Sequence, residues 1–210
     1  MARVLTGASG FQHSGWDESY YPPDIPADWK LAFYANDFTA ILLPEFVWRE
    51  TSHDDLEQWL EDIDEGFRVY LRVSCSMPDL DECGKISKLL APYFAGFFID
   101  QDVKVDANEL FPKLSPDINW LLSQQHRPKD ENDSIRYWIR YWGQLESIDH
   151  RVNAVVIQSE MDKRKLRQAI EKIEPYLDTN NDVLVLYDVS SPVAQDLKDL
   201  RILLELMAIA

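Results

Sequence analysis

Arg3-Val-Leu-Thr-Gly-Ala-Ser-Gly-Phe11 is the stretch that decides the fold of this chain. A short apolar run ends on two glycines three residues apart, and an aromatic loop with Trp16, Tyr20 and Tyr21 follows before a helix begins. This order is typical of a buried parallel strand that delivers a loop to one end of an α/β domain.

The same order recurs along the chain: an apolar run, a polar or aromatic loop, and an amphipathic segment. Repeated βα units predict a parallel sheet with helices outside it. We therefore expect a single α/β domain over residues 1–210, a (β/α)8 TIM-barrel-like fold. Because such barrels typically have about 250 residues, it would be compact or partly degenerate, shortened between residues 115 and 150. The strands are expected at 3–8, 41–43, 67–74, 94–99, 118–122, 152–157 and 182–187, and the helices at 28–36, 53–63, 79–91, 108–114, 162–177 and 193–208.

Periodicity does not decide between strand and helix for residues 135–142. The segment alternates as a strand would, but Ile135, Trp138, Ile139 and Trp142 share one face of a helix. Because Ser134 could cap a helix, we expect a helix here.

The charge argues against one class of partner. The 210 residues include 37 acidic and 21 basic side chains, which give a net charge of -16. Such a charge repels phosphate backbones, so nucleic acid is an unlikely partner. The basic run at residues 163–167 lies in a helical pattern and is expected to be a solvated helix face.

Other sequence features bear on the cellular location and on cofactors. Cys75 and Cys83 are too far apart for a C-x-x-C pair, and no apolar leader or membrane span is apparent. We therefore expect a cytoplasmic location. The sequence has no metal signature, P-loop, dinucleotide fingerprint or nucleophile elbow, so we expect no metal and no cofactor. A small-molecule ligand or a protein partner remains open, and the sequence does not give the oligomeric state.

Candidate site residues lie where barrel strands end, since chemistry in TIM barrels occurs at that end. Asp100 and Asp188 are candidate catalytic acids or bases, although they could equally cap the following helices. An arginine that points into a barrel must be paired or bind an anion. By strand alternation, Arg72 shares a face of its strand with Arg68 and Tyr70. The sequence does not decide whether this face points into the barrel or out of it. The candidate ligand-binding residues are Ser9, His13, Trp16, Tyr21, Glu45, Arg49 and Arg72.

The opening resembles that of the YecE-like proteins, a family of unknown function. The resemblance rests on Gly7-Ala-Ser-Gly-Phe11, Trp16, Tyr21-Pro22, Trp29 and Phe33-Tyr-Ala35. It extends over residues 3–74 and returns over 152–206, and it implies a TIM-barrel fold.

The strand ends depart from the family pattern. Leu42 and Pro44 stand where the family has Glu and Asn, and Phe46 stands where it has Thr. Arg49 is kept, and Arg72 replaces a Lys.

Two hypotheses follow. In the first, the barrel mouth binds or turns over a small polar or anionic metabolite, a sugar or phosphate compound held by Arg49 and Arg72. In the second, the barrel has lost its site and uses its aromatic loop and acidic surface to bind a protein, with apolar side chains filling the mouth.

Overall fold

Eight parallel strands close into a barrel in the computed structural model, which describes residues 3–74, 79–100, 118–123, 137–141, 154–158, 163–174, 182–189 and 193–206. Each strand pairs with its neighbour in sequence, and β1 pairs with β8. The predicted (β/α)8 fold is therefore confirmed. The strands are β1 (Val4–Ser9), β2 (Ala40–Leu43), β3 (Arg68–Val73), β4 (Phe94–Ile99), β5 (Trp120–Ser123), β6 (Tyr137–Tyr141), β7 (Ala154–Ile157) and β8 (Val183–Tyr187).

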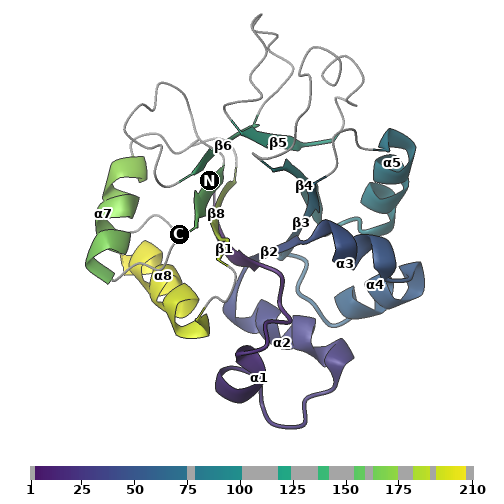
Figure 1. The fold of residues 1–210 in the computed structure, drawn as a ribbon, viewed down its shortest axis with the longest axis horizontal. Helices are drawn as coiled ribbons and strands as arrows, with labels where there is room; N and C mark the ends of the chain where they lie inside the picture. Colours follow the sequence, from purple (N-terminus) through teal and green to yellow (C-terminus); the bar gives the residue numbers. More distant parts are fainter. Residues whose placement is uncertain are drawn as a thin grey trace, which may run out of the picture.

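Helices surround the barrel on the outside (Figure 1). Two begin at a side-chain cap, because Ser52 and Asp79 accept hydrogen bonds from backbone N–H groups of the first turn. The helix predicted at 108–114 lies outside the described residues. The described helices are α1 (Trp16–Ser19), the 3-10 helix η1 (Ala27–Trp29), α2 (Lys30–Asp37), α3 (Glu45–Glu50), α4 (His53–Leu60), α5 (Leu80–Leu89), α7 (Lys163–Ile173) and α8 (Ala194–Leu206).

Two apolar layers form the core. One fills the barrel, as in other TIM barrels, and the other packs between the strands and the helices. Alternate residues of each strand therefore face opposite layers. The residues inside the barrel are Leu5, Ala40, Leu42, Tyr70, Phe98, Leu121, Ala154, Val156, Leu184 and Leu186.

The junction of β1 and β2 requires a glycine and a tyrosine. A Cβ on Gly7 would lie 2.1 Å from the Ala40 carbonyl oxygen and 3.2 Å from the Tyr34 hydroxyl. The fully buried Tyr34 hydroxyl accepts a hydrogen bond from the Ala8 N–H at 2.7 Å and donates one to the Ala40 carbonyl at 3.0 Å. A side chain from α2 thus bridges the backbones of the two strands.

Two predictions about local structure are wrong. The helix expected at 135–142 is instead strand β6, over Tyr137–Tyr141, because the segment supplies the strand that joins β5 to β7. Trp29 lies on a face of the helix predicted at 28–36, which would place it in the core, but it is 61% exposed, at the end of the short helix η1 that precedes α2.

The barrel closes through contacts between the two ends of the described chain. Arg3 donates to the Asp182 carboxylate from its backbone N–H at 3.1 Å and from its guanidinium at 2.8 Å. Outside the barrel, Lys198 of α8 forms an ion pair with Asp37 at 2.8 Å, and Arg201 donates to the Asp37 carbonyl at 2.6 Å. Both the ring of strands and the layer of helices are therefore joined at this seam.

None of the described helices is long and apolar enough to cross a membrane. Cys83 is buried, while Cys75 lies outside the described residues. The single-domain assignment for residues 1–210 stays a prediction.

Replacing Tyr34 by Phe should lower the free energy of unfolding by about 1 to 3 kcal/mol, because two buried backbone groups lose their partner. Gly7→Ala should cost more, since its Cβ would overlap the Ala40 carbonyl. Chemical denaturation followed by circular dichroism measures both. Tyr93→Phe, which removes a hydroxyl bound to a single carbonyl, is the control and should cost less. A Gly7→Ala variant as stable as the parent would show that β1 and β2 do not need this close approach.

Asp182 makes part of the stability depend on pH. Burial acts to raise the pKa of its carboxyl, but hydrogen bonds and charge from Arg3, with a contribution from Arg68, lower it overall. A carboxyl with a lowered folded-state pKa stabilises the fold above its unfolded pKa of about 3.9 and stops doing so as the pH falls through the folded value. Asp182→Asn should therefore be less stable than the parent at pH 7, and thermal unfolding should show the gap narrow below about pH 4. Substitution of the exposed Asp62 by Asn is the control. A stability difference between the parent and Asp182→Asn that does not change with pH would contradict a lowered pKa for Asp182.

Candidate functional site

The interior of the barrel changes from apolar to polar at the carboxyl ends of the strands. Tyr70, Phe98 and Leu186 point into the barrel, so the residues two positions later continue on the same face. The inward-facing residues of this last layer include Ser9, Arg72, Asp100, Gln158 and Asp188. Strand alternation did not decide whether Arg72 points into the barrel or out of it. In the structure it points into the barrel.

Arg72 lies between the two candidate catalytic carboxylates. Its Nη2 is 2.7 Å from Asp188 Oδ2, and its Nε is 3.8 Å from Asp100 Oδ2. The side chains of Arg72 and Asp188 are only 16% and 15% exposed. Strands β3, β4 and β8, which are distant in the sequence, thus bring together three charged residues predicted from strand ends.

The arginine is held more by charge than by hydrogen-bond alignment. Its Nε and Nη2 are buried, and neither makes an aligned hydrogen bond with a described residue. The guanidinium carbon also lies 5.8 Å from the centre of the Phe98 ring. The Arg72–Asp100–Asp188 cluster, counted by its formal charges, has one more negative than positive charge. Such a cluster can orient hydroxyl groups and move a proton at a carboxylate.

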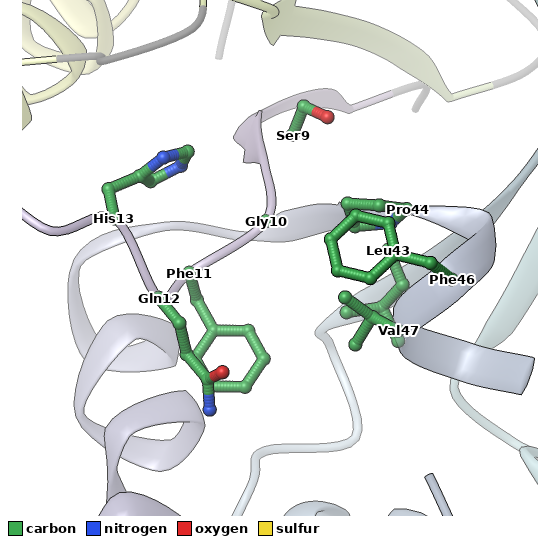
Figure 2. A pocket seen from close by; sticks show the side chains of 9 residues that line it. All are labelled: Ser9, Gly10, Phe11, Gln12, His13, Leu43, Pro44, Phe46 and Val47. Atoms are coloured by element: carbon green, nitrogen blue, oxygen red, sulfur yellow. The ribbon is translucent and has the colours of Figure 1, made fainter. Parts of the chain in front are cut away.

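Ser9 and His13 line a pocket of about 190 Å³ (Figure 2). One wall is formed by residues 9–13, from the end of β1 into the following loop, and the other by residues 43, 44, 46 and 47, from the end of β2 into α3. The Gly10 N–H donates to the Leu42 carbonyl at 2.8 Å, which holds the two walls in place.

The imidazole of His13 is partly buried in this pocket. Burial lowers its pKa below the ordinary value, although hydrogen bonds to the backbone of Gly10 and Ser9 act in the opposite direction. The ring therefore is mostly neutral at pH 7. It packs edge-on against Trp16, with ring centres 4.6 Å apart.

Glu45 and Arg49 of α3 form their ion pairs with each other and with a neighbouring helix. Glu45 Oε2 accepts a hydrogen bond from the Ser74 N–H at 2.6 Å, and Glu45 Oε1 lies 2.8 Å from Arg49 Nε. Arg49 also pairs with Glu82 of α5 and stacks on the Trp48 ring. Arg49 thus connects α3 with α5, and the expectation that Arg49 and Arg72 hold one anion together stays a prediction.

Trp16 and Tyr21 belong to the core. Their exposed fractions are 1% and 5%, and the Tyr21 hydroxyl donates to the Phe11 carbonyl. Burial raises the pKa of Tyr21. Both were predicted to bind a ligand. Because their rings are buried in the core, they are not exposed to one in this structure.

Sequence reasoning missed one wall of the pocket. Phe46 and Val47 belong to a helix that was not predicted, although Pro44 directly before Glu45 is a common helix start. Among the residues that the structure describes, no group of three or more His, Cys, Asp or Glu side chains is arranged to hold a metal ion. Asp102, which also follows β4, lies outside them.

Comparisons with known proteins agree on the family and the fold. A family profile described as "Protein of unknown function DUF72" matches residues 5–206. A DUF72 family protein from Thermotoga maritima MSB8 has a similar structure, with a TM-score of 0.57 and 13% identity, covering 97% of this chain and 99% of that one. A DUF72 family protein from Enterococcus faecalis V583 gives a TM-score of 0.62 and 9% identity, covering 96% and 95%. No curated protein matches the sequence.

The pair Arg72–Asp188 should be strongly coupled in stability. Replacing one partner of a largely buried pair leaves an uncompensated charge, so Arg72→Met or Asp188→Asn alone should each cost roughly 3 kcal/mol. The double variant should cost less than the sum, with a coupling of about 1 to 3 kcal/mol in a double-mutant cycle by urea unfolding. The exposed pair Arg3–Asp182 is the control cycle, with an expected coupling below about 1 kcal/mol. Equal coupling in both cycles would mean that the cluster is as solvated as the surface.

Proposed function

Because this chain belongs to the DUF72 family, the family of YecE-like proteins, we propose that it follows the TIM-barrel plan and binds a small polar metabolite at the carboxyl end of its strands. The ligand contacts the Arg72–Asp100–Asp188 cluster. The similarity to solved structures supports the fold alone, so the rest of the proposal comes from the residues of this chain.

The observation that carries the proposal is the change of character in the last layer of the barrel. Every inward side chain of the inner core cluster is apolar except for the hydroxyl of Tyr70, and the next layer contains an arginine and two aspartates. Burying such charges is costly, so a layer filled with apolar side chains would serve stability at least as well. Charged residues that fold from three separate strands into one cluster are therefore better explained by a ligand.

The charges favour a neutral, hydroxyl-bearing ligand over a phosphate. Arg72 already lies beside two carboxylates, and the cluster carries an excess negative charge. Carboxylates accept hydrogen bonds from hydroxyl groups, and a guanidinium donates to hydroxyl oxygens. A sugar or another polyol meets both requirements, whereas a phosphate would be repelled by Asp100 and Asp188.

Asp100 and Asp188 are the groups that could act as acid and base if the ligand is turned over. Arg72 would then position them and stabilise the charge that remains on one carboxylate.

The alternative, a protein-interaction module, is favoured by the exposed aromatic side chain of Trp29. This hypothesis expects apolar side chains at the barrel mouth, whereas the last layer of the barrel contains Arg72, Asp100 and Asp188.

A thermal-shift screen of the purified protein tests the proposal against neutral sugars and polyols, sugar phosphates, sugar acids, nucleotides and divalent metals. A ligand present at 100 times its Kd should stabilise the fold by about 2.7 kcal/mol. We expect a neutral polyol to raise the Tm of the parent and of the control Arg49→Met, whose arginine pairs with Glu45 and Glu82, but not of Arg72→Met or Asp188→Asn.

Two results would contradict the proposal. Stabilisation by a phosphate compound that is lost in Arg49→Met would place an anion site at Arg49. No response across the panel, from protein with a sharp unfolding transition, would favour the interaction module.

A further inference from the structure

The pocket between the loop after β1 and the start of α3 begins at the inner face of the barrel. Ser9, which lines it, continues the inward face of β1 on which Leu5 lies. Leu43, which also lines it, belongs to the outer layer of the core. The pocket therefore extends from the last layer of the barrel outward, past the end of β2.

The strand register places Ser9 beside the charged cluster. Ala8 of β1 pairs with Tyr187 of β8, and Ser9 and Asp188 are the residues that follow these two. Neighbouring strands lie about 4.8 Å apart, and both residues continue the inward faces of their strands. Asp188 Oδ2 is in turn 2.7 Å from Arg72 Nη2. One end of the pocket is therefore one strand away from the cluster.

The pocket differs in character from the cluster. Arg72, Asp100 and Asp188 do not line it. Its apolar lining residues are Phe11, Leu43, Pro44, Phe46 and Val47. Such a lining favours the apolar part of a ligand, whereas the cluster favours hydroxyl groups. The two adjoining sites together suit a ligand that has one polar and one apolar part.

The space between the two walls of the pocket has room for one ring. Gly10 has a φ of +81°, which favours glycine, and a Cβ there would lie 3.9 Å from Pro44 Cδ of the opposite wall. A protein cavity of roughly 150 Å³ is large enough for benzene. A pocket of about 190 Å³ therefore accommodates a six-membered ring and a small substituent.

The wall formed by α3 favours an aromatic ring. Phe46 is 65% exposed, and Figure 2 shows Pro44 and Phe46 on one side of Gly10 and His13 on the other. Pairs of aromatic rings gain more from their preferred packing than from burial of their area alone. An aryl group therefore binds this wall better than an alkyl group of the same size.

We propose that the ligand of this protein is a polyol with an aryl substituent, of the aryl glycoside class, and that the pocket holds the aryl ring. The hydroxyl-bearing part lies at the Arg72–Asp100–Asp188 cluster, and the bond between the two parts passes Ser9. This inference rests on the proposed function, because the pocket receives only the apolar part of the ligand that the cluster binds.

The test is isothermal titration calorimetry of the full chain with matched methyl and phenyl glycosides of glucose, galactose, mannose and xylose, in both anomeric forms. The members of a pair carry the same sugar and differ only in the group that the pocket would hold. We expect the phenyl member of the binding pair to have a Kd about tenfold lower than the methyl member, since its ring leaves water and packs on Phe46.

Two variants and a control assign this preference to the two sites. Phe46→Ala removes part of one wall and should reduce the preference for phenyl over methyl about threefold. Trp29→Ala is the matched control, because Trp29 is 61% exposed and does not line the pocket, and here the preference should equal that of the parent. Asp188→Asn should weaken the binding of both members of the pair by a similar factor.

The outcomes separate the inference from the proposed function. Equal Kd values for the methyl and phenyl glycosides, or a preference that Phe46→Ala does not reduce, would overturn the inference and leave the proposed sugar site at the cluster standing. Binding that Asp188→Asn does not weaken would overturn the proposed function, and the inference with it. Absence of binding by every glycoside of the series would also overturn both.

Discussion

The close approach of β1 and β2 at Gly7 is the constraint on which the rest of this half of the barrel depends. The Ala40 carbonyl occupies the place of a Cβ at Gly7, and the Tyr34 hydroxyl links the two strand backbones. Beyond this junction the strands end at Ser9 and Leu43, side by side. Their exit loops therefore form facing walls, and both the pocket and the edge of the barrel mouth follow from the junction.

The charged cluster at the mouth shows how a barrel can hold an arginine inside. Arg72 is enclosed by protein, so its charge needs nearby carboxylates, which β4 and β8 supply. The apolar layers below, including Tyr70 and Phe98, reduce the screening of these charges by water. A cluster of this kind is preorganised, because its charges are already positioned before anything binds.

The sequence predicted the barrel because its βα units repeat, which is a local pattern. It placed Arg72, Asp100 and Asp188 at strand ends, but alternation alone left the face of Arg72 open. Arg72 could be assigned to one face once Tyr70 was known to point inward. The surroundings of other candidate residues depend instead on contacts distant in sequence: Arg49 pairs with Glu82, and Trp16 is enclosed by α2 through its contact with Tyr34. Strand β6 was misjudged for a similar reason, since its neighbours β5 and β7, and not its own periodicity, determine its conformation.

The pairing of β1 with β8 has a consequence for how the chain folds. Val4 pairs with Val183, so one edge of β1 stays without its partner until most of the polypeptide has left the ribosome. Such long-range pairing slows folding, because a large loop must close before the contact forms. The exposed strand edge is a template for association between nascent chains during this interval. Synthesis of the last βα unit is thus the step that makes a closed barrel possible.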